Sequence, residues 1–282
     1  MNVTPKEKQI QILMALVEGN SIRSTERMTG VHRDTIMRLM VRVGEGCQAV
    51  LDNRLRGLKC KRLQLDEIWT FVGKKQGRLS MAERRNTDLG DQYIFVAIDA
   101  DTKLVPAFTV GRRDGTTTLK FMVDLQARLK IDPQAKLNSN GHPQITTDGF
   151  TPYIDAIDQL FGIDVHYAQL IKVYAAEHAG RGRYAPPKVS EVLSKIITGN
   201  PDHRFISTSY VERQNLTMRM HIRRLTRLTN AFSKKLRNLK AAVALHFAHY
   251  NFKRIHRTLK CTPAMEAGIA DHVWEWEELV AC

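Results

Sequence analysis

The chain has 282 residues, of which 43% are hydrophobic and 26% are charged, as in a soluble globular protein with one large domain and a smaller one. The formal net charge of +14 indicates an anionic partner. The most apolar run, residues 241–249, is short and interrupted by histidines, and the chain begins without an apolar signal-peptide core, so we expect no membrane partner.

Three short helices are expected in the first sixty residues. Thr4 to Glu7 combine a helix N-cap, a proline at the first helical position and a capping-box glutamate, and Gly19 ends this helix. A second helix is expected over residues 21–28, and a third begins near His32 after a glycine-containing turn. This order predicts an all-α helix-turn-helix domain over residues 1–58.

The third helix has an apolar face and a polar, basic face. Its apolar positions are Ile36, Leu39, Met40 and Val43. The candidate DNA contacts on and before its other face are His32, Arg33, Thr35, Arg38 and Arg42. Because this helix would enter the major groove, the basic face favours DNA binding over the alternative of a generic three-helix bundle with a solvated surface.

After a basic connector, the pattern changes from helical to β-type. Strands are expected over residues 63–72, 93–98 and 104–110, with turn residues between them, which predicts an antiparallel meander. A helix over 116–129, a strand over 144–147, a helix from 151 and a strand over 165–173 follow, before a last long helix. This element order predicts an α/β fold: an RNase H-like mixed five-stranded sheet with helices.

Three acids fall at comparable places in these elements. Asp66 lies in the first strand, Asp148 at the end of the fourth, and Glu212 near the start of the last long helix. The first and fourth strands are neighbours in such a sheet, and the helix crosses the same edge. Carboxylates suit Mg²⁺ or Mn²⁺, and two such ions can activate a nucleophile and stabilise a leaving oxygen of a DNA phosphodiester. We therefore predict Asp66, Asp148 and Glu212 as catalytic residues and metal ligands.

Each acid also has a simpler interpretation. The segment from Ser209 to Glu212 fits a capping box, and Asp148 precedes a glycine and fits a turn. Glu67 is adjacent to Asp66, and spacing alone does not choose between them. Asp99 fits a turn, which we favour, or a fourth ligand.

The part of the sequence that contains Glu212 is strongly basic. Between Asp202 and Glu266 there are fourteen Lys and Arg residues and one acid, Glu212. A solvated helix usually mixes both signs, so this stretch indicates a surface for DNA phosphates rather than an ordinary charged face. The candidate DNA contacts, which we expect along one continuing helix, are Asn215, Arg219, Arg223, Arg224 and Arg227.

The four cysteines are scattered and form no C-x-x-C pair. They are Cys47, Cys60, Cys261 and Cys282. This spacing argues against a zinc ribbon and against a disulfide framework, and it suits a reducing cytoplasm. We therefore expect no zinc and a cytoplasmic protein.

Several segments resemble the DDE transposases of bacterial insertion sequences, with most likeness to the insertion-sequence-one-like group. They are Leu65–Trp69, Thr147–Gly149 and Ser209–Arg219. A later segment, Tyr250–Leu259 followed by Thr262-Pro263-Ala264, is similar to the end of many integrase-like catalytic domains. The resemblance implies an integrase-like core in which the three acids bind Mg²⁺, with Mn²⁺ as a substitute, and in which Arg219 contacts the transposon end.

The resemblance also implies function and partners. It indicates an enzyme of DNA transposition and recombination that cleaves and joins strands at a mobile element. Its partners would be double-stranded DNA, as terminal inverted repeats and target, and further copies of itself in a homodimer or higher oligomer associated with the nucleoid. The alternatives are a catalytically inert, transposase-derived DNA-binding regulator and an RNase H-like nuclease.

The chain departs from that family in one spacing. The 64 residues from Asp148 to Glu212 exceed the compact spacing of integrases, so we expect an insertion at about residues 175–205. The likeness ends near Gly268. We accordingly expect a catalytic domain over residues 59–268 and a C-terminal tail over residues 269–282.

Overall fold

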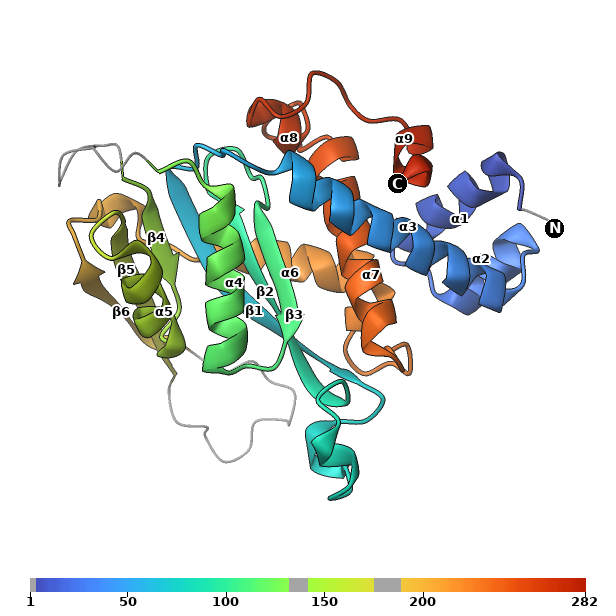
Figure 1. Cartoon of the computed structure of the whole chain (residues 1–282), viewed down its shortest axis with the longest axis horizontal. Helices are drawn as coiled ribbons and strands as arrows, with labels where there is room; N and C mark the ends of the chain where they lie inside the picture. Colours follow the sequence, from blue (N-terminus) through green and yellow to red (C-terminus); the bar gives the residue numbers. More distant parts are fainter. Residues whose placement is uncertain (1–3, 132–141, 175–188) are drawn as a thin grey trace.

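The computed structural model describes residues 4–131, 142–174 and 189–282. A mixed six-stranded sheet lies at one side of the molecule, and a group of helices lies at the other (Figure 1). The strands are β1 (Arg62–Val72), β2 (Gly90–Asp99), β3 (Ala107–Gly111), β4 (Gln144–Thr147), β5 (His166–Tyr174) and β6 (Val189–Thr198). Their order across the sheet is β3-β2-β1-β4-β5-β6.

The first three strands form the expected antiparallel meander. β1 pairs with β2 and β2 with β3 in antiparallel register, whereas β4 is parallel to both β1 and β5. The predicted α/β class, with a mixed sheet that follows a helical N-terminal region, is confirmed.

A sixth strand corrects the expected number of five. β6 pairs antiparallel with β5 and lies inside the segment expected to be an insertion. Its apolar residues, Val189, Val192, Leu193, Ile196 and Ile197, are spaced as in an amphipathic helix, and most of its side chains are exposed, so the alternation that marks a half-buried strand is missing. Residues 175–188 of the expected insertion lie outside the described residues.

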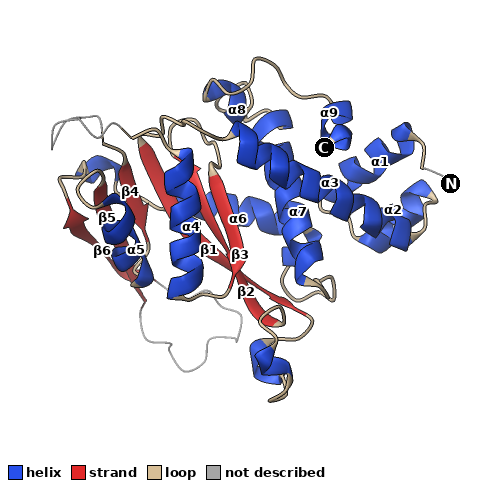
Figure 2. Cartoon of the chain, in the orientation of Figure 1, coloured by secondary structure: helices blue, strands red, loops and turns tan. Residues whose placement is uncertain are grey.

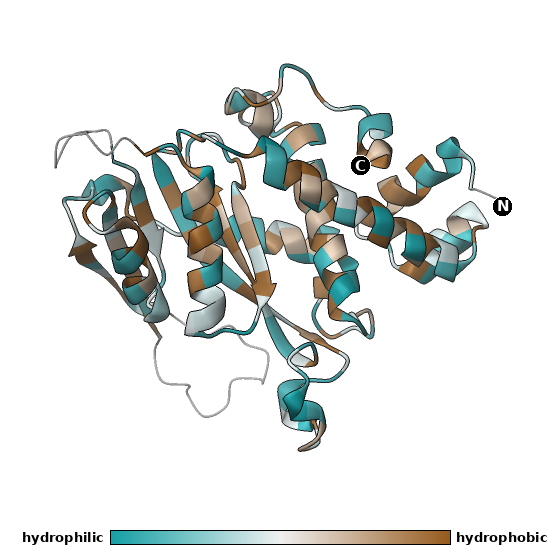
Figure 3. Ribbon diagram, in the orientation of Figure 1, coloured by the Kyte–Doolittle hydropathy of each residue, from teal (hydrophilic) through white to brown (hydrophobic). Residues whose placement is uncertain are grey.

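Helices cover both faces of the sheet. α4 (Gly115–Arg128) and α5 (Pro152–Phe161) lie on one face, and α6 (Ser209–His221) lies against the other (Figures 1 and 2). Alternate residues of β2 divide accordingly: Phe95 packs in the core beneath α4 and α5, and Val96 packs in a second core that includes residues of α6 and α7 (Leu236–Ala248). Figure 3 shows the same alternation as bands of apolar colour along the strands.

The three predicted N-terminal helices are present as α1 (Lys6–Val17), α2 (Ile22–Thr29) and α3 (Arg33–Arg54). The Ser21 hydroxyl caps α2 by accepting from the amide of Ser24, and Gly30 ends that helix with a φ of 70°. The predicted apolar face of α3 is buried.

α3 runs to Arg54 and packs closely on α7. A Cβ atom at Gly44 would lie 2.2 Å from the carbonyl oxygen of Ala241, so the two backbones are nearly in contact. One hydrophobic core runs from Ile12 in α1 through α3 and α7 to Val96 in the sheet. The division of the chain at residues 58 and 268 stays a prediction.

The last residues fold back onto the N-terminal helices. Trp274 stacks on Phe252 with ring centroids 4.3 Å apart, and Leu279 is buried. Here the structure contains a π-helix (His249–Lys253), α8 (Pro263–Glu266) and α9 (Trp276–Ala281), which lies beside α1 (Figure 1). The 3₁₀ turns are η1 (Gln76–Arg78), η2 (Glu83–Arg85), η3 (His203–Phe205) and η4 (Arg223–Leu225).

None of the four cysteines, all in the described part of the chain, forms a disulfide. Of the described helices, none has both the length and the apolar character needed to cross a lipid bilayer.

Candidate functional site

An acidic cluster lies where β1 and β4 run side by side. Asp66, Glu67 and Asp148 each offer a carboxylate oxygen, and these oxygens lie within 4.8 Å of one another. Leu65 is paired with Thr147 across the two parallel strands, so Asp66, which continues β1, and Asp148, which follows the end of β4, lie at the same level. The structure thus brings Asp66 and Asp148 together and adds Glu67, which spacing alone could not separate from Asp66.

α6 is attached to β1 beside this cluster. The Gln64 side-chain oxygen accepts hydrogen bonds from the backbone amides of Tyr210 at 2.8 Å and Val211 at 3.2 Å. One turn later, Asn215 donates from Nδ2 to Oδ2 of Asp66 at 2.8 Å. Asn215, predicted as a DNA contact, therefore holds a carboxylate of the cluster.

Glu212 lies between these two attachments but does not form part of the three-residue cluster. Its carboxylate accepts hydrogen bonds from Lys172 Nζ on β5 and from the Thr208 hydroxyl, the latter at 2.6 Å. Thr208, not Ser209, is the N-cap residue of α6, and no side chain caps the helix. The capping-box interpretation of Glu212 is therefore wrong, which leaves its position beside Asp66 without a purely local explanation.

Two cations contact the acids. Arg113, in the turn between β3 and α4, donates from Nε to Glu67 at 3.0 Å and from Nη2 to Asp148 at 3.4 Å, and its guanidinium lies 3.8 Å from the ring centroid of Phe150. Lys172 pairs with Glu212. The sequence analysis missed both residues, because nothing local distinguishes them from other turn or strand cations.

The electrostatics of the cluster favour an added cation. Burial raises the pKa of Asp66 to about 7, with a further rise from the charge of Glu67 and smaller ones from Asp148 and Glu212. Burial and Asp148 likewise raise the pKa of Glu67, against the opposing effects of nearby Tyr153 and Arg113. Crowded, half-buried carboxylates of this kind bind a proton or a divalent ion more readily than exposed ones.

The donor set suits a hard divalent cation. The cluster consists of carboxylates from neighbouring strands, with oxygens close enough to share an ion, and oxygen ligands are those that Mg²⁺ and Mn²⁺ prefer. Among the described residues no histidine or cysteine joins this group. The residues present therefore fit the predicted metal.

The predicted DNA contacts of α3 differ in their surroundings. Arg33 and Arg38 are exposed near the start of the helix. His32 caps α3 by accepting from the amide of Asp34 at 3.3 Å, and Thr35 is half-buried. Arg42 donates to the side chain of Gln9 at 2.8 Å. His32 and Arg42 are exposed as well, so Thr35 is the least accessible of the five candidates.

The expectation of one continuing basic helix after Glu212 is wrong. α6 ends at His221, and Ile222 is extended and buried, so a turn follows instead. Burial of Ile222 in the core ends the helix, although no glycine or proline marks the place. Arg223 and Arg227 are exposed in the segment after the helix and do not share its face.

Arg219 and Arg224 are engaged within the protein. Arg219 donates to the carbonyl oxygens of Leu225 at 3.1 Å and Trp69 at 3.5 Å, which connects α6 to β1. Arg224 is half-buried and donates to the hydroxyl of Ser233 at 3.3 Å. Burial lowers the pKa of each to about 10.

Asp99 lies at the far end of β2 and is a turn residue, as expected. It accepts hydrogen bonds from the amide and hydroxyl of Thr102 at 3.2 Å and 2.7 Å.

The comparisons with known proteins reveal only weak likenesses. No family model matches the chain, and no curated relative matches it. The chain is 13% identical to a chain of a pre-cleavage Mos1 transpososome, over 57% of this chain and 59% of that one, with a TM-score of 0.23. It is 12% identical to a piggyBac transposase in a synaptic complex with hairpin DNA, over 100% of this chain and 72% of that one, with a TM-score of 0.37. At TM-scores this low, neither likeness assigns a function.

Proposed function

We propose that this chain is a DDE-type transposase of an insertion sequence, which binds the ends of its element and catalyses metal-dependent DNA strand cleavage and strand transfer. The observation that carries the proposal is that Asp66, inside β1, meets Asp148, directly after the end of the parallel strand β4, next to the helix that bears Glu212. The bond from Asn215 to Asp66 holds that helix in place.

The residues of the proposed site have different roles. Asp66, Asp148 and Glu212 are the proposed ligands of two Mg²⁺ ions, and Mn²⁺ would substitute. Bound metal would supply an activated water or 3′-hydroxyl and stabilise charge on the leaving oxygen. Asn215 orients the Asp66 carboxylate, and Lys172 partly neutralises Glu212, which would weaken metal binding by that carboxylate.

The partners follow from the charge distribution. Arg33 and Arg38 at the start of α3 are placed to contact element ends, and Arg223 and Arg227 to contact neighbouring phosphates. Target DNA and a second copy of the chain complete the proposed assembly, which would act on the chromosome in the cytoplasm.

The test replaces each ligand without changing its volume. Asp66→Asn, Asp148→Asn and Glu212→Gln should each reduce Mg²⁺-dependent nicking of a DNA fragment that carries the element end by about a thousandfold or more. Binding to the same fragment and the melting temperature should change little. Asp155→Asn, at an exposed acid on α5, is the matched control and should cleave normally. Normal cleavage by all three ligand variants would refute the proposed site.

A specific observation favours a second candidate. Lys172 and Arg113 already neutralise Glu212 and Asp148, as expected in a DNA-binding regulator that no longer binds metal. Such a protein would bind element ends selectively but show no cleavage with Mg²⁺ or Mn²⁺. A nuclease of the same fold would cleave without joining strands.

A further inference from the structure

A cavity with a strong excess of positive charge lies away from the acidic cluster. Its volume is about 650 Å³, and it opens between the start of α2, the start of α3, α7 and the segment that follows α6. Its cationic lining residues are Arg23, Arg33, Arg223, Arg224 and Lys234. Among the described residues that line it, Asp34 is the one acid.

Arg224 reaches this cavity from the inside of the protein. Its hydrogen bonds are to the Ser233 hydroxyl at 3.3 Å and the sulfur of Met40 at 3.2 Å, both neutral partners. None of the described carboxylates forms an ion pair with it, and burial lowers its pKa to about 10. A half-buried guanidinium without a counter-ion is costly to maintain, and a bound anion would offset that cost.

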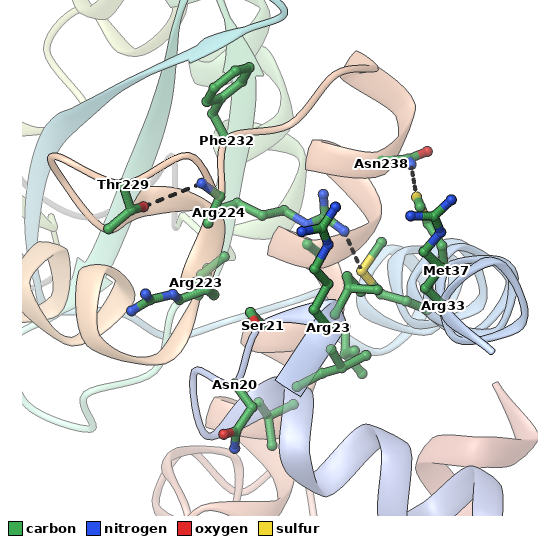
Figure 4. A pocket seen from close by; sticks show the side chains of 18 of the residues that line it. Asn20, Ser21, Arg23, Arg33, Met37, Arg223, Arg224, Thr229, Phe232 and Asn238 are labelled. Atoms are coloured by element: carbon green, nitrogen blue, oxygen red, sulfur yellow. Dashed lines mark hydrogen bonds between the residues drawn. The ribbon is translucent and has the colours of Figure 1, made fainter. Parts of the chain in front are cut away.

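Of the other cationic lining residues, Arg33 alone has an acidic partner among the described residues. Asp34 lies 3.8 Å from the guanidinium of Arg33 and the same distance from the ring of His32, both exposed contacts. Figure 4 shows the side chains of Arg224 and Arg23 extending towards each other from the segment after α6 and from α2. Like charges directed into one space indicate a site for an anion between them.

The lining residues of the cavity indicate which class of anion it would bind. Arginine binds phosphate oxygens through parallel N–H donors, and several arginines around one space suit a group with several acceptor oxygens better than a single carboxylate. The Ser21 hydroxyl and the Asn238 amide also line the cavity and can complete the contacts. The remaining lining residues include the apolar Ile22, Met37, Met40, Phe232 and Leu245 and the polar Asn20, His221, Thr229, Asn230 and His246.

The geometry points to a phosphate-binding site in this cavity, in which Arg224 and Arg23 hold one phosphate group between the N-terminal helices and the segment after α6. The phosphate belongs either to a DNA backbone or to a small phosphorylated compound. The inference deepens the proposed function by naming a second contact point for DNA, but phosphate binding here does not require strand cleavage.

Thermal unfolding with pyrophosphate tests the site on the whole protein. Saturating pyrophosphate should raise the melting temperature on the order of 5 °C above that in chloride of equal ionic strength. Arg23→Gln and Arg224→Met should each lose at least half of this rise. Arg257→Gln, at an exposed arginine outside the cavity lining, should keep it. Should Arg224→Met fail to fold, Arg23→Gln and Lys234→Gln carry the test. Equal rises in every variant would show diffuse charge screening and overturn the inference.

Duplex binding distinguishes the two sources of phosphate. If the group comes from DNA, pyrophosphate should compete with a duplex, and Arg23→Gln should weaken duplex binding about tenfold. If it comes from a small compound, duplex affinity should be unchanged while the thermal shift is still lost. An unchanged thermal shift together with unchanged duplex affinity would reject the site. A protein that shows the shift but never cleaves DNA would refute the proposed function alone.

Discussion

Lys172 on β5 forms an ion pair with Glu212 on α6, one helical turn from the hydrogen bond between Asn215 and Asp66. The Lys172 ammonium group therefore contacts the carboxylate that we propose as a metal ligand. Lys172 and Thr208 both bond Oε1 of Glu212, so a bound divalent ion and Lys172 would compete for the charge of this carboxylate.

Replacing Lys172 with glutamine should remove this competition. The pair is partly exposed, so its contribution is at most about 1 kcal/mol, and we expect the Mg²⁺ concentration for half-maximal cleavage to fall about fivefold at most. Lys195→Gln, at an exposed lysine on β6, is the control and should leave the requirement unchanged. A higher Mg²⁺ requirement in Lys172→Gln would instead assign the lysine to substrate binding.

Asp66 and Glu67 should differ sharply in their effect on cleavage. Asp66 contacts α6 through Asn215. The Glu67 side chain, in contrast, is 1% exposed, pairs with Arg113 and lies near Tyr153. We expect Glu67→Gln to slow cleavage less than about tenfold and Asp66→Asn to slow it about a thousandfold or more. Single-turnover cleavage rates at saturating Mg²⁺ show which of the two variants is slower. If Glu67→Gln is the slower one, Glu67 and not Asp66 is the ligand.

His249 should make folding less favourable in acid. Burial, reinforced by Arg254 and His221, lowers its pKa from 6.5 to about 4 in the folded protein. In the unfolded chain His249 therefore becomes protonated below about pH 6.5. In the folded chain it stays neutral until about pH 4. Stability is lost as the pH falls through this window, by at most about 3 kcal/mol. Urea unfolding from pH 7 to 4 should show a shallower loss in His249→Gln than in the wild type, and parallel curves would contradict the assignment.

Gly44→Ala should destabilise the packing of α3 on α7. The new methyl group would lie 2.2 Å from the carbonyl oxygen of Ala241, so the helices must separate, at a cost of about 3 kcal/mol despite the better helix propensity of alanine. Gly77→Ala, where nothing lies within 4 Å of the added carbon, is the control. Urea denaturation measures both, and equal stabilities would show that α3 and α7 adjust freely.

The parts of the fold that local pattern determines could be predicted. β4 begins and ends where the sequence indicated, and the apolar face of α3 is the buried one. The approach of Asp66 to Asp148 followed from the expected neighbourhood of their strands. The positions of these two aspartates in the sequence therefore predicted the centre of the site.

The remainder depends on contacts between distant segments. The end of α6 at His221 results from burial of the next residue, and β6 carries apolar residues at helical spacing while it pairs as a strand. Arg113 and Lys172 look like ordinary cations until the fold places them against acids from other elements. No local pattern encodes those pairings.

The close contact of α3 with α7 has a consequence for how the protein would measure DNA. α3 has 22 residues, about 33 Å of straight helix, with the exposed Arg33 and Arg38 near its start and an apolar face buried in the core along its length. If α3 recognises the element end as proposed, its distance from the acidic cluster is fixed, because α3 packs in the same hydrophobic core as β1. The number of base pairs between the recognised sequence and the cut would then be constant, and an insertion of a few base pairs between them would abolish cleavage without weakening recognition.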